Sequence, residues 1–364
     1  MAISFLDMTI DELIAALAEM GENPYRAAQL ADWVYRKGVT DPSKMSNLPP
    51  NLLARFDILT SRIAGRTESR DGTVKLLLEL ADGRGFSAGP AGSGDPFHVE
   101  TVLIPEPRRA TACLSTQVGC AMGCSFCASG IGGLVRNCTC GEMLQQVLHL
   151  QQACLPAAGQ GGSRHVTNVV FMGMGEPLAN FDQVVAALEV LTDPQRFGIS
   201  ARKITVSTIG LPEGIRKLAR LAMPVTLAIS LHAPDDELRR RLIPAAGGTS
   251  IEQILAAARE FYQSRKREVT LEYLLLAGVN DDPARADQLA RLTGKLRCNV
   301  NLICYNPVPG LPYRRPGQAA VKAFAGRLAA KGINANVRRS RGLDAAAACG
   351  QLRRHAENVV NSQR

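Results

Sequence analysis

The 364-residue chain contains no apolar run long enough to cross a bilayer, and it does not start with the basic, apolar and small-residue pattern of a secretory signal. It also lacks a Walker phosphate loop, a Gly-x-Ser-x-Gly nucleophile elbow and an internal repeat of short fixed period. These absences argue against a membrane partner and against the sites that such motifs form. We expect a soluble, cytoplasmic and monomeric protein.

The composition is that of a folded chain with a basic surface. Hydrophobic residues make up 46% of the sequence, enough for one large domain and a small one. The formal net charge of +9 suits a polyanion such as nucleic acid, although an ordinary basic protein carries the same charge. Ten cysteines in a chain of this length are too few for a disulfide scaffold, so they indicate metal ligands or redox-active thiols.

The pattern of residues changes twice along the chain. Thr9 and Glu12 form a capping box ahead of an amphipathic helix, and Asp71-Gly72 marks a tight turn in a β-hairpin over 66–86. A Gly-, Ala- and Pro-rich stretch, 83–96, follows as a linker. We therefore expect a helical accessory module at 1–60, a hairpin and linker at 61–98, an α/β core at 99–345, and a terminal segment at 346–364.

The core alternates short apolar runs with helical stretches, which is typical of β-α units and a parallel sheet. Parallel sheets carry their chemistry at the carboxyl ends of the strands, and the distinctive polar residues of this chain fall there. If the strand order is sequential, these residues converge in space. The expected strands are Val99–Ile104, Ala112–Ser115, Val166–Met172, Lys203–Ser207, Thr226–Ser230, Val269–Leu275, Val300–Ile303 and Ala335–Val337.

The most informative stretch is a C-x3-C-x2-C loop formed by Cys120, Cys124 and Cys127. Three closely spaced thiolates suit a soft metal or an iron–sulfur cluster, and no fourth cysteine stands at short regular spacing. Three ligands on a [4Fe-4S] cluster leave one iron open. The loop resembles that of the radical S-adenosylmethionine (SAM) superfamily, in which the open iron binds SAM. A zinc knuckle and incidental core cysteines are the other interpretations.

Residues at the following strand ends are candidates for SAM contacts. Glycines around Gly175 let a backbone approach a ligand closely, and Glu176 is placed to accept from an ammonium group. A plain strand-to-helix turn and structural polar groups explain the same residues without a ligand. The predicted SAM-binding set is Gly175, Glu176, Ser207, Ser230, Leu231, His232 and Asn306.

Several motifs together resemble the RlmN/Cfr family of radical SAM RNA methyltransferases. They cover nearly the whole chain, and the combination of the cysteine loop, Gly-Met-Gly-Glu-Pro and Ala-Cys-Gly-Gln-Leu is very specific. The resemblance implies an α/β fold: a partial (β/α)6-type radical SAM barrel with a small N-terminal helical accessory domain. The matching stretches are 99–101, 113–127, 135–137, 171–178, 230–233, 273–281, 306–310 and 341–352.

The resemblance also assigns roles to two otherwise unexplained cysteines. It implies that Cys349 takes a methyl group from one SAM, while a second SAM yields the radical that activates this methyl group for addition to an adenine. Glu100 matches the proton acceptor. Cys113 then attacks the sulfur of Cys349, which releases the methylated base and leaves a transient disulfide. Cysteine carriers are required because C2 of adenine is too electron-poor to attack SAM directly.

Several functions remain open at this point. The first is C2 methylation of an adenine in 23S rRNA and possibly tRNA, served by an electron donor of the flavodoxin or ferredoxin type and a thiol reductant. The others are C8 methylation of the rRNA, a non-catalytic zinc-stabilised RNA-binding protein, and a radical SAM enzyme with another substrate. Candidate phosphate contacts are Lys37, Arg314, Arg315, Arg338, Arg339, Arg341, Arg353 and Arg354, each of which is also explained as a surface charge.

Five cysteines fall outside these motifs. Cys138 and Cys140 stand where the family usually has Leu and Ala and imitate a C-x-C metal site; we interpret them as neutral substitutions, because Thr139 and Glu142 already form a helix cap. Cys304 replaces a usual proline, and Cys154 and Cys298 match no motif.

Overall fold

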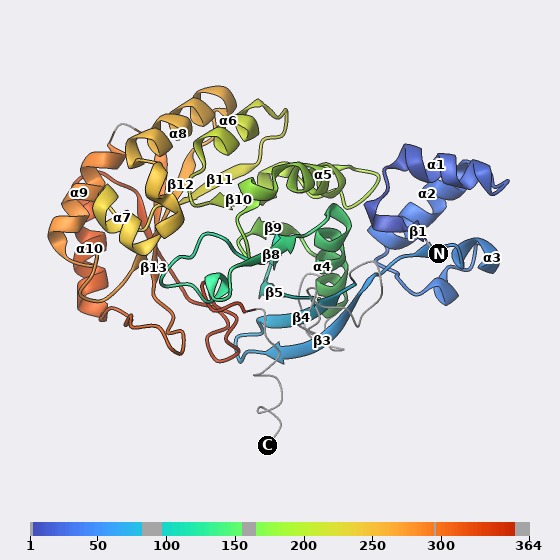
Figure 1. Ribbon diagram of the computed structural model, residues 1–364, viewed down its shortest axis with the longest axis horizontal. Helices are drawn as coiled ribbons and strands as arrows, with labels where there is room; N and C mark the ends of the chain where they lie inside the picture. Colours follow the sequence, from blue (N-terminus) through green and yellow to red (C-terminus); the bar gives the residue numbers. More distant parts are fainter. Residues whose placement is uncertain (1–2, 82–96, 155–164, 295, 354–364) are drawn as a thin grey trace, which may run out of the picture.

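The computed structural model describes residues 3–81, 97–154, 165–294 and 296–353 (Figure 1). The whole linker expected at 83–96 lies outside these ranges, as do residues 354–364 of the terminal segment, which include Arg354. In the described part of the chain no helix has both the length and the apolar character needed to span a membrane.

The N-terminal residues form the expected helical module. Thr9 and Glu12 make the predicted capping box, and Gly21 follows the first helix with a φ of +73°. Short strands β1 (Ile3–Ser4) and β2 (Phe56–Asp57) pair in parallel and bring the two ends of the module together. Its helical elements are η1 (Phe5–Asp7), α1 (Ile10–Glu19), α2 (Tyr25–Ala31), the π-helical turn η2 (Asp32–Arg36), η3 (Pro42–Lys44) and α3 (Pro50–Leu53).

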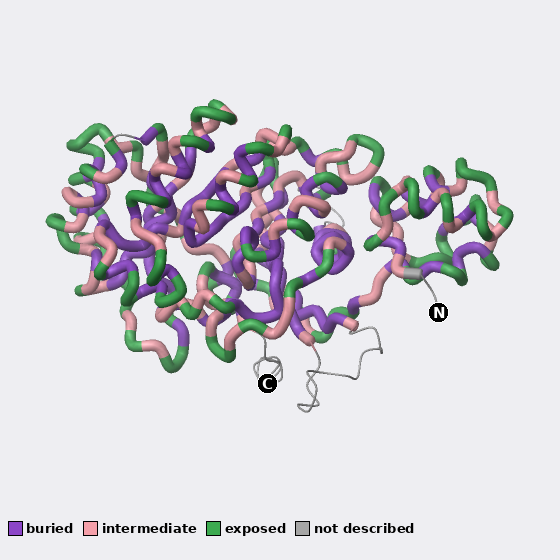
Figure 2. Tube along the Cα trace, turned by 45° about the horizontal axis from the view of Figure 1, so that its top comes forward, coloured by how far each residue is buried: buried purple, intermediate pink, exposed green. Residues whose placement is uncertain are grey.

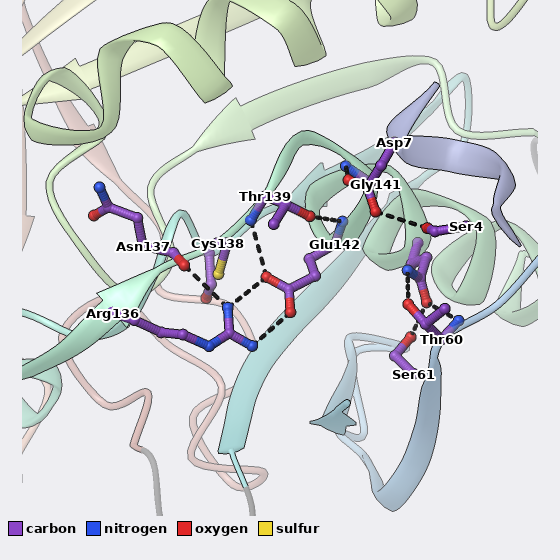
Figure 3. A network of polar contacts seen from close by, with 12 residues as sticks. Ser4, Asp7, Thr60, Ser61, Arg136, Asn137, Cys138, Thr139, Gly141 and Glu142 are labelled. Atoms are coloured by element: carbon purple, nitrogen blue, oxygen red, sulfur yellow. Dashed lines mark hydrogen bonds and ion pairs between the residues drawn. The ribbon is translucent and has the colours of Figure 1, made fainter. Parts of the chain in front are cut away.

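This module is joined to the core at the amino end of α4 (Cys140–Ala153). The Asp7 carboxylate accepts a hydrogen bond from the Gly141 backbone N–H at 2.8 Å, as Figure 3 shows. A Cβ at Gly141 would stand 2.5 Å from that carboxylate, so glycine is required for the close approach. Thr139 and Glu142 form the predicted capping box of the same helix. The Arg136 guanidinium donates two hydrogen bonds to the Glu142 carboxylate, of 2.7 and 2.6 Å.

The core is built on one large sheet. Its ten described strands run in the order β14-β13-β12-β11-β10-β9-β6-β5-β4-β3. The part from β6 to β14 is parallel and follows the sequence order, so the carboxyl ends of its strands share one rim. The strands are β3 (Ser61–Glu68), β4 (Val74–Leu80), β5 (Phe97–Glu106), β6 (Arg109–Cys113), β9 (Asn168–Phe171), β10 (Ile204–Thr208), β11 (Thr226–Ser230), β12 (Val269–Leu275), β13 (Cys298–Cys304) and β14 (Ala335–Arg338).

One expectation about this sheet is wrong. The strand expected at 99–104 is β5, and it pairs antiparallel with β6 rather than continuing the parallel series. The reason is the connection, because only two residues separate β5 from β6 and a parallel crossover needs a dozen or more. The hairpin β3–β4 then extends the same sheet by antiparallel pairing, so it is an edge of the core and not a free-standing unit.

Helices cover the outer side of the parallel strands in Figure 1, and the buried residues gather between helices and sheet in Figure 2. Helix α4 packs instead against β3, β4 and β5. The cysteine loop lies between β7 (Gln117–Gly119) and β8 (Leu134–Asn137), which pair antiparallel. The remaining core helices are α5 (Phe181–Thr192), α6 (Pro212–Arg220), α7 (Asp236–Leu242), α8 (Ile251–Arg265), α9 (Pro283–Thr293) and α10 (Gln318–Ala330).

Candidate active site

The cysteine loop is held at the rim of the sheet from two sides. On one side Ser125 donates its backbone N–H to the carbonyl of Leu242, the last residue of α7, at 2.9 Å. On the other side Ala128 donates to the carbonyl of Gly350 at 2.8 Å. The second contact brings the terminal segment, with Cys349, against residues that directly follow Cys127.

Cys120, Cys124 and Cys127 line one cavity whose empty volume is about 950 Å³, including its opening to solvent. In the described part of the chain, no three His, Cys, Asp or Glu side chains converge on a point where a single ion would sit. A [4Fe-4S] cluster makes a different demand, because each cysteine binds a separate iron. Three thiols around one cavity therefore fit such a cluster.

The three thiols lie in a largely apolar surrounding. Burial raises the pKa of Cys120 to about 11 and raises the pKa values of Cys124 and Cys127. The thiols therefore keep their protons until metal binding displaces them. The buried guanidinium of Arg239, on α7, donates to the Ile209 carbonyl, and its positive charge favours the thiolate of Cys124.

Glu176 lies at the floor of the same cavity and is held on both carboxylate oxygens. One oxygen accepts from the Leu178 N–H at 3.0 Å and the other from the Ile209 N–H at 2.8 Å. Burial raises its pKa to about 7, against the lowering effect of these bonds. The preceding residue, Gly175, has a φ of +101°. A Cβ on Gly175 would stand 2.6 Å from the Gln117 side chain. The carboxylate is thus oriented to meet a cationic ligand group.

His232 faces the cavity as a neutral donor. Its Nδ1 accepts the backbone N–H of Leu274 at 3.0 Å, so the proton of the neutral ring is on Nε2. Burial lowers the pKa of the imidazole to about 3, and the ring stands edge-on to Phe126 with the ring centroids 5.0 Å apart. The residue has a φ of +57°, which turns it out of the strand direction. It offers a hydrogen bond without a charge.

The other predicted SAM contacts divide into two groups. Gly175, Ser207 and Ser230 line the cavity with the cysteines. Leu231 is fully buried and contributes its backbone N–H to the Glu272 carbonyl at 3.0 Å. Asn306 lines the second cavity, described below, together with Cys127, and its amide donates to the carbonyl of Cys349 at 3.2 Å.

Cys113 and Cys349 line a second cavity that adjoins the first. The two cavities share wall residues, among them Cys127, Met172, Arg338 and Cys349, so they lie directly side by side. Cys113 is buried at the end of β6, and burial raises the pKa of its thiol to about 12, while the nearby Arg338 favours the thiolate. Cys349 is exposed. The fold thus brings two thiols from opposite ends of the core into one space beside the cysteine loop.

Glu100 lies under the terminal segment. Its Oε2 accepts the backbone N–H of Arg353 at 2.6 Å, and its Oε1 lies 2.7 Å from the ammonium of Lys75. Among the described residues, Glu100 does not belong to the wall of either cavity, although Val102, on the same face of β5, does. The Arg353 backbone and the Lys75 ammonium thus occupy both oxygens of this carboxylate.

The β3–β4 hairpin holds the chain just before the terminal segment. The Asp344 side chain accepts hydrogen bonds from Ser69 and from the Arg70 backbone N–H, and the Asp71 carboxylate accepts from the Gly342 N–H at 3.1 Å. Further along, Ser129 donates to the Leu352 carbonyl at 2.9 Å. The chain that leads into the terminal segment is thus bound to the hairpin, and the segment itself is bound to the residues after the cysteine loop.

Comparison with known proteins identifies the family. A model of the radical SAM superfamily matches residues 114–289, and a model of the ribosomal RNA large subunit methyltransferase N-terminal domain matches residues 3–59. A probable dual-specificity RNA methyltransferase RlmN from Rhodopirellula baltica is 43% identical over 97% of this chain and 91% of its own length. The chain belongs to the RlmN family of radical SAM RNA methyltransferases.

Two further relatives agree with this assignment. The dual-specificity RNA methyltransferase RlmN of Solidesulfovibrio magneticus is 44% identical over 96% of both chains. The crystal structure of a radical SAM methyltransferase from Sphaerobacter thermophilus shares 42% identity and a TM-score of 0.89, covering 97% of this chain and all of that one. The predicted fold class and family are confirmed. Membership of the superfamily implies a [4Fe-4S] cluster and SAM as its cofactors.

Some residues of this RlmN-family site carry no signal in the sequence. Lys75 lies in an apolar strand, and Arg202 and Lys203 stand at the start of another expected strand, yet the structure puts Lys75 beside Glu100 and the other two in the wall of the second cavity. The unassigned cysteines separate from the site: Cys138 and Cys154 are buried, and among the described residues none of the five lines either cavity. In the sequence, only the comparison with the family motifs distinguished these five cysteines from the five predicted site cysteines.

Proposed function

We propose that the protein methylates C2 of adenine in two RNAs. The targets are the adenosine of the peptidyl-transferase centre in 23S rRNA and the adenosine 3′ of the anticodon in tRNA. The observation that supports this most is the shared cavity of Cys113 and Cys349 beside the three-cysteine loop. A radical SAM enzyme that needs no cysteine methyl carrier has no use for two further thiols there. The names of the relatives, dual-specificity RNA methyltransferase RlmN, agree.

In this proposal the cysteines divide the work. Cys120, Cys124 and Cys127 hold the cluster, which when bound supplies the electron that cleaves SAM to an adenosyl radical. Cys349, exposed on the terminal segment, accepts the methyl group and presents it to the adenine. Glu100 takes the ring proton, and Cys113 attacks the Cys349 sulfur to release the product as a disulfide forms. A thiol reductant and a flavodoxin- or ferredoxin-type electron donor restore the resting state.

The SAM contacts are proposed from the cavity wall. The Glu176 carboxylate accepts a hydrogen bond from the amino group of SAM, because it is fixed by two backbone N–H groups and lines the cavity that the cysteines and the strand ends share. Ser207, Ser230 and the Nε2–H of His232 offer neutral hydrogen bonds to the ribose and carboxylate. The backbone near Gly175 allows the close approach.

The second cavity offers an entrance for RNA. Its wall contains six cationic side chains and one carboxylate, that of Glu106. Arg202, Lys203 and Arg339 make no ion pair with any residue that the structure describes. Unpaired cations beside a space that leads to the methyl carrier suit the phosphates around an unstacked adenine. The cations are Arg109, Arg202, Lys203, Arg338, Arg339 and Arg341.

The proposal also assigns the four parts of the chain. Residues 1–60 are an accessory RNA-binding domain, 61–98 a hairpin and linker, 99–345 the barrel, and 346–364 the segment that carries the methyl group. The match of residues 3–59 to a ribosomal RNA methyltransferase N-terminal domain supports the first assignment. A soluble monomer in the cytoplasm completes the proposal.

Nucleoside mass spectrometry of rRNA and tRNA from cells with and without the gene tests this function. We expect 2-methyladenosine to disappear from both RNAs in the deletion strain and to return with the intact gene. A gene with Cys349→Ala should not restore it, whereas Cys138→Ala, a change of a cysteine away from both cavities, should. Loss of 8-methyladenosine with no change in 2-methyladenosine would instead assign C8 as the target.

A further inference from the structure

Lys75 is the charged residue in closest contact with Glu100. The register of β4 and β5 places Lys75 opposite Val102 and Leu77 opposite Glu100, so Lys75 and Glu100 are diagonal neighbours on one face of the sheet. Their charged atoms lie 2.7 Å apart, and their side chains are only 14% and 8% exposed. Water therefore screens this pair very little.

The ammonium of Lys75 also reaches the terminal segment. It donates a hydrogen bond to the Ala346 carbonyl at 3.2 Å, three residues before Cys349. Ala346 has a φ of +47°, which non-glycine residues rarely adopt, and it turns the backbone toward β4. One cation thus contacts both the predicted base and the loop that carries the predicted methyl carrier.

We propose that Lys75 is a positioning residue that keeps the Glu100 carboxylate ionised and aligned with the Cys349 loop. Burial by itself favours the neutral acid, and a neutral acid cannot accept the ring proton. An adjacent ammonium opposes that effect. This inference rests on the proposed function, in which Glu100 accepts the proton of the adenine ring.

The physical consequence is a dependence on pH. Burial raises the pKa of Glu100, and the Lys75 charge, the Arg353 N–H bond and the Arg353 charge oppose that rise. Without the Lys75 charge, Glu100 binds a proton more tightly and ionises only at higher pH. A variant that lacks the charge is therefore slow at pH values below the pKa of Glu100 and recovers as the pH rises. A merely structural role for Lys75 would slow the reaction equally at every pH.

The test uses the full chain with its cluster reconstituted and an RNA stem-loop that contains the target adenine. Single-turnover reactions are quenched at intervals, and the decay of the protein–RNA adduct is followed on denaturing gels from mildly acidic to alkaline pH. The measured quantity is the ratio of the parent rate to the variant rate at each pH. The ionisation of Cys113 affects parent and variant alike, so it cancels in this ratio.

For Lys75→Gln we expect a ratio that approaches about ten at the acidic end of the range, below the pKa of Glu100, as a rise of about one pKa unit produces, and that falls toward one at alkaline pH. Glutamine still donates to the Ala346 carbonyl, so the variant removes the charge and keeps the tether. Lys75→Met, which removes both, should show the same trend. Lys75→Arg should stay near one throughout, and so should Arg66→Met, a matched loss of charge at an exposed position on β3.

A ratio that is the same at every pH for Lys75→Gln and Lys75→Met would overturn the inference. Glu100→Gln separates this failure from failure of the proposed function. If Glu100→Gln blocks adduct decay while the Lys75 ratio does not depend on pH, only the role of Lys75 is wrong. If Glu100→Gln resolves the adduct at the parent rate, the assignment of Glu100 as proton acceptor fails, and the role of Lys75 fails with it.

Discussion

At the scale of single residues, the two predicted working thiols stand in unequal surroundings. Cys349 is exposed on a loop, as a carrier that meets both SAM and RNA must be, whereas Cys113 is buried at a strand end. Burial holds the pKa of Cys113 near 12, so its thiol is almost fully protonated at neutral pH. In the proposed reaction this burial would keep the thiol from attacking before the adduct has formed.

Replacing Cys113 tests this division of roles. Cys113→Ala should accumulate a covalent adduct between the protein and its RNA, because the thiol that releases the product is missing. Denaturing gels detect the adduct, and mass spectrometry of its peptides should place the RNA on Cys349. The double variant Cys113→Ala/Cys349→Ala should form no adduct. Normal multiple turnover by Cys113→Ala would contradict the role assigned to Cys113.

At the scale of elements, the turn after β9 shapes the SAM cavity. Gly173 and Gly175 flank Met174, and a Cβ on either would stand 2.6 Å from a neighbouring side chain. The Gln117 side chain fills the space beside Gly175 and accepts the Glu176 backbone N–H at 2.8 Å. The turn therefore fits against β7 only while glycine occupies both positions.

Gly175→Ala should weaken SAM binding by about tenfold or more, equal to about 1.4 kcal/mol, because the added methyl group displaces Gln117 and with it Glu176. Equilibrium dialysis of SAM against reconstituted protein measures the loss. Gly247→Ala is the matched control, since a Cβ there meets nothing within 4 Å. Equal SAM affinity in Gly175→Ala and Gly247→Ala would show that the turn does not shape the site, provided that both retain their iron.

At the scale of the whole molecule, the terminal segment closes the open side of the sheet. The chain after β14 crosses to the β3–β4 hairpin at the far edge of the sheet. The described part of the terminal segment then contacts the cysteine loop. The antiparallel strands β3, β4 and β5 thus form the surface on which the carrier segment rests. The cationic wall of the second cavity lies beside this closure, which supports entry of RNA at the same place.

Neutralising cationic side chains in the wall of the second cavity should weaken RNA binding mainly through loss of phosphate contacts. The double variant Arg202→Gln/Lys203→Gln should lower affinity for a stem-loop with an unpaired adenine and should reduce the slope of log K against log salt by about 1.4 to 1.8, two contacts' worth. Fluorescence anisotropy at several salt concentrations measures both. The control variant Arg240→Gln/Arg241→Gln removes the same charge from exposed positions on α7 that do not line the second cavity. Equal salt slopes for the two double variants would contradict the assignment.

Some of this architecture follows directly from the sequence. The capping boxes at Thr9 and Thr139 depend on residues three apart, and the parallel strands depend on short apolar runs, so both are readable locally. The direction of β5 was predicted wrongly, although the two-residue turn before Arg109 contained the information. The family, and with it the radical chemistry, followed from motifs that occupy a few residues each.

The sequence by itself determined the family and the three cluster cysteines as predicted ligands, because both depend on motifs that each occupy one short stretch. Only the tertiary structure decided which residues surround Glu100 and Cys349. The bond from Arg353 to Glu100 joins residues 253 positions apart, and the contact of Lys75 with Ala346 joins residues 271 apart. Such contacts arise from how the sheet closes on itself, and no local pattern of residue types encodes them.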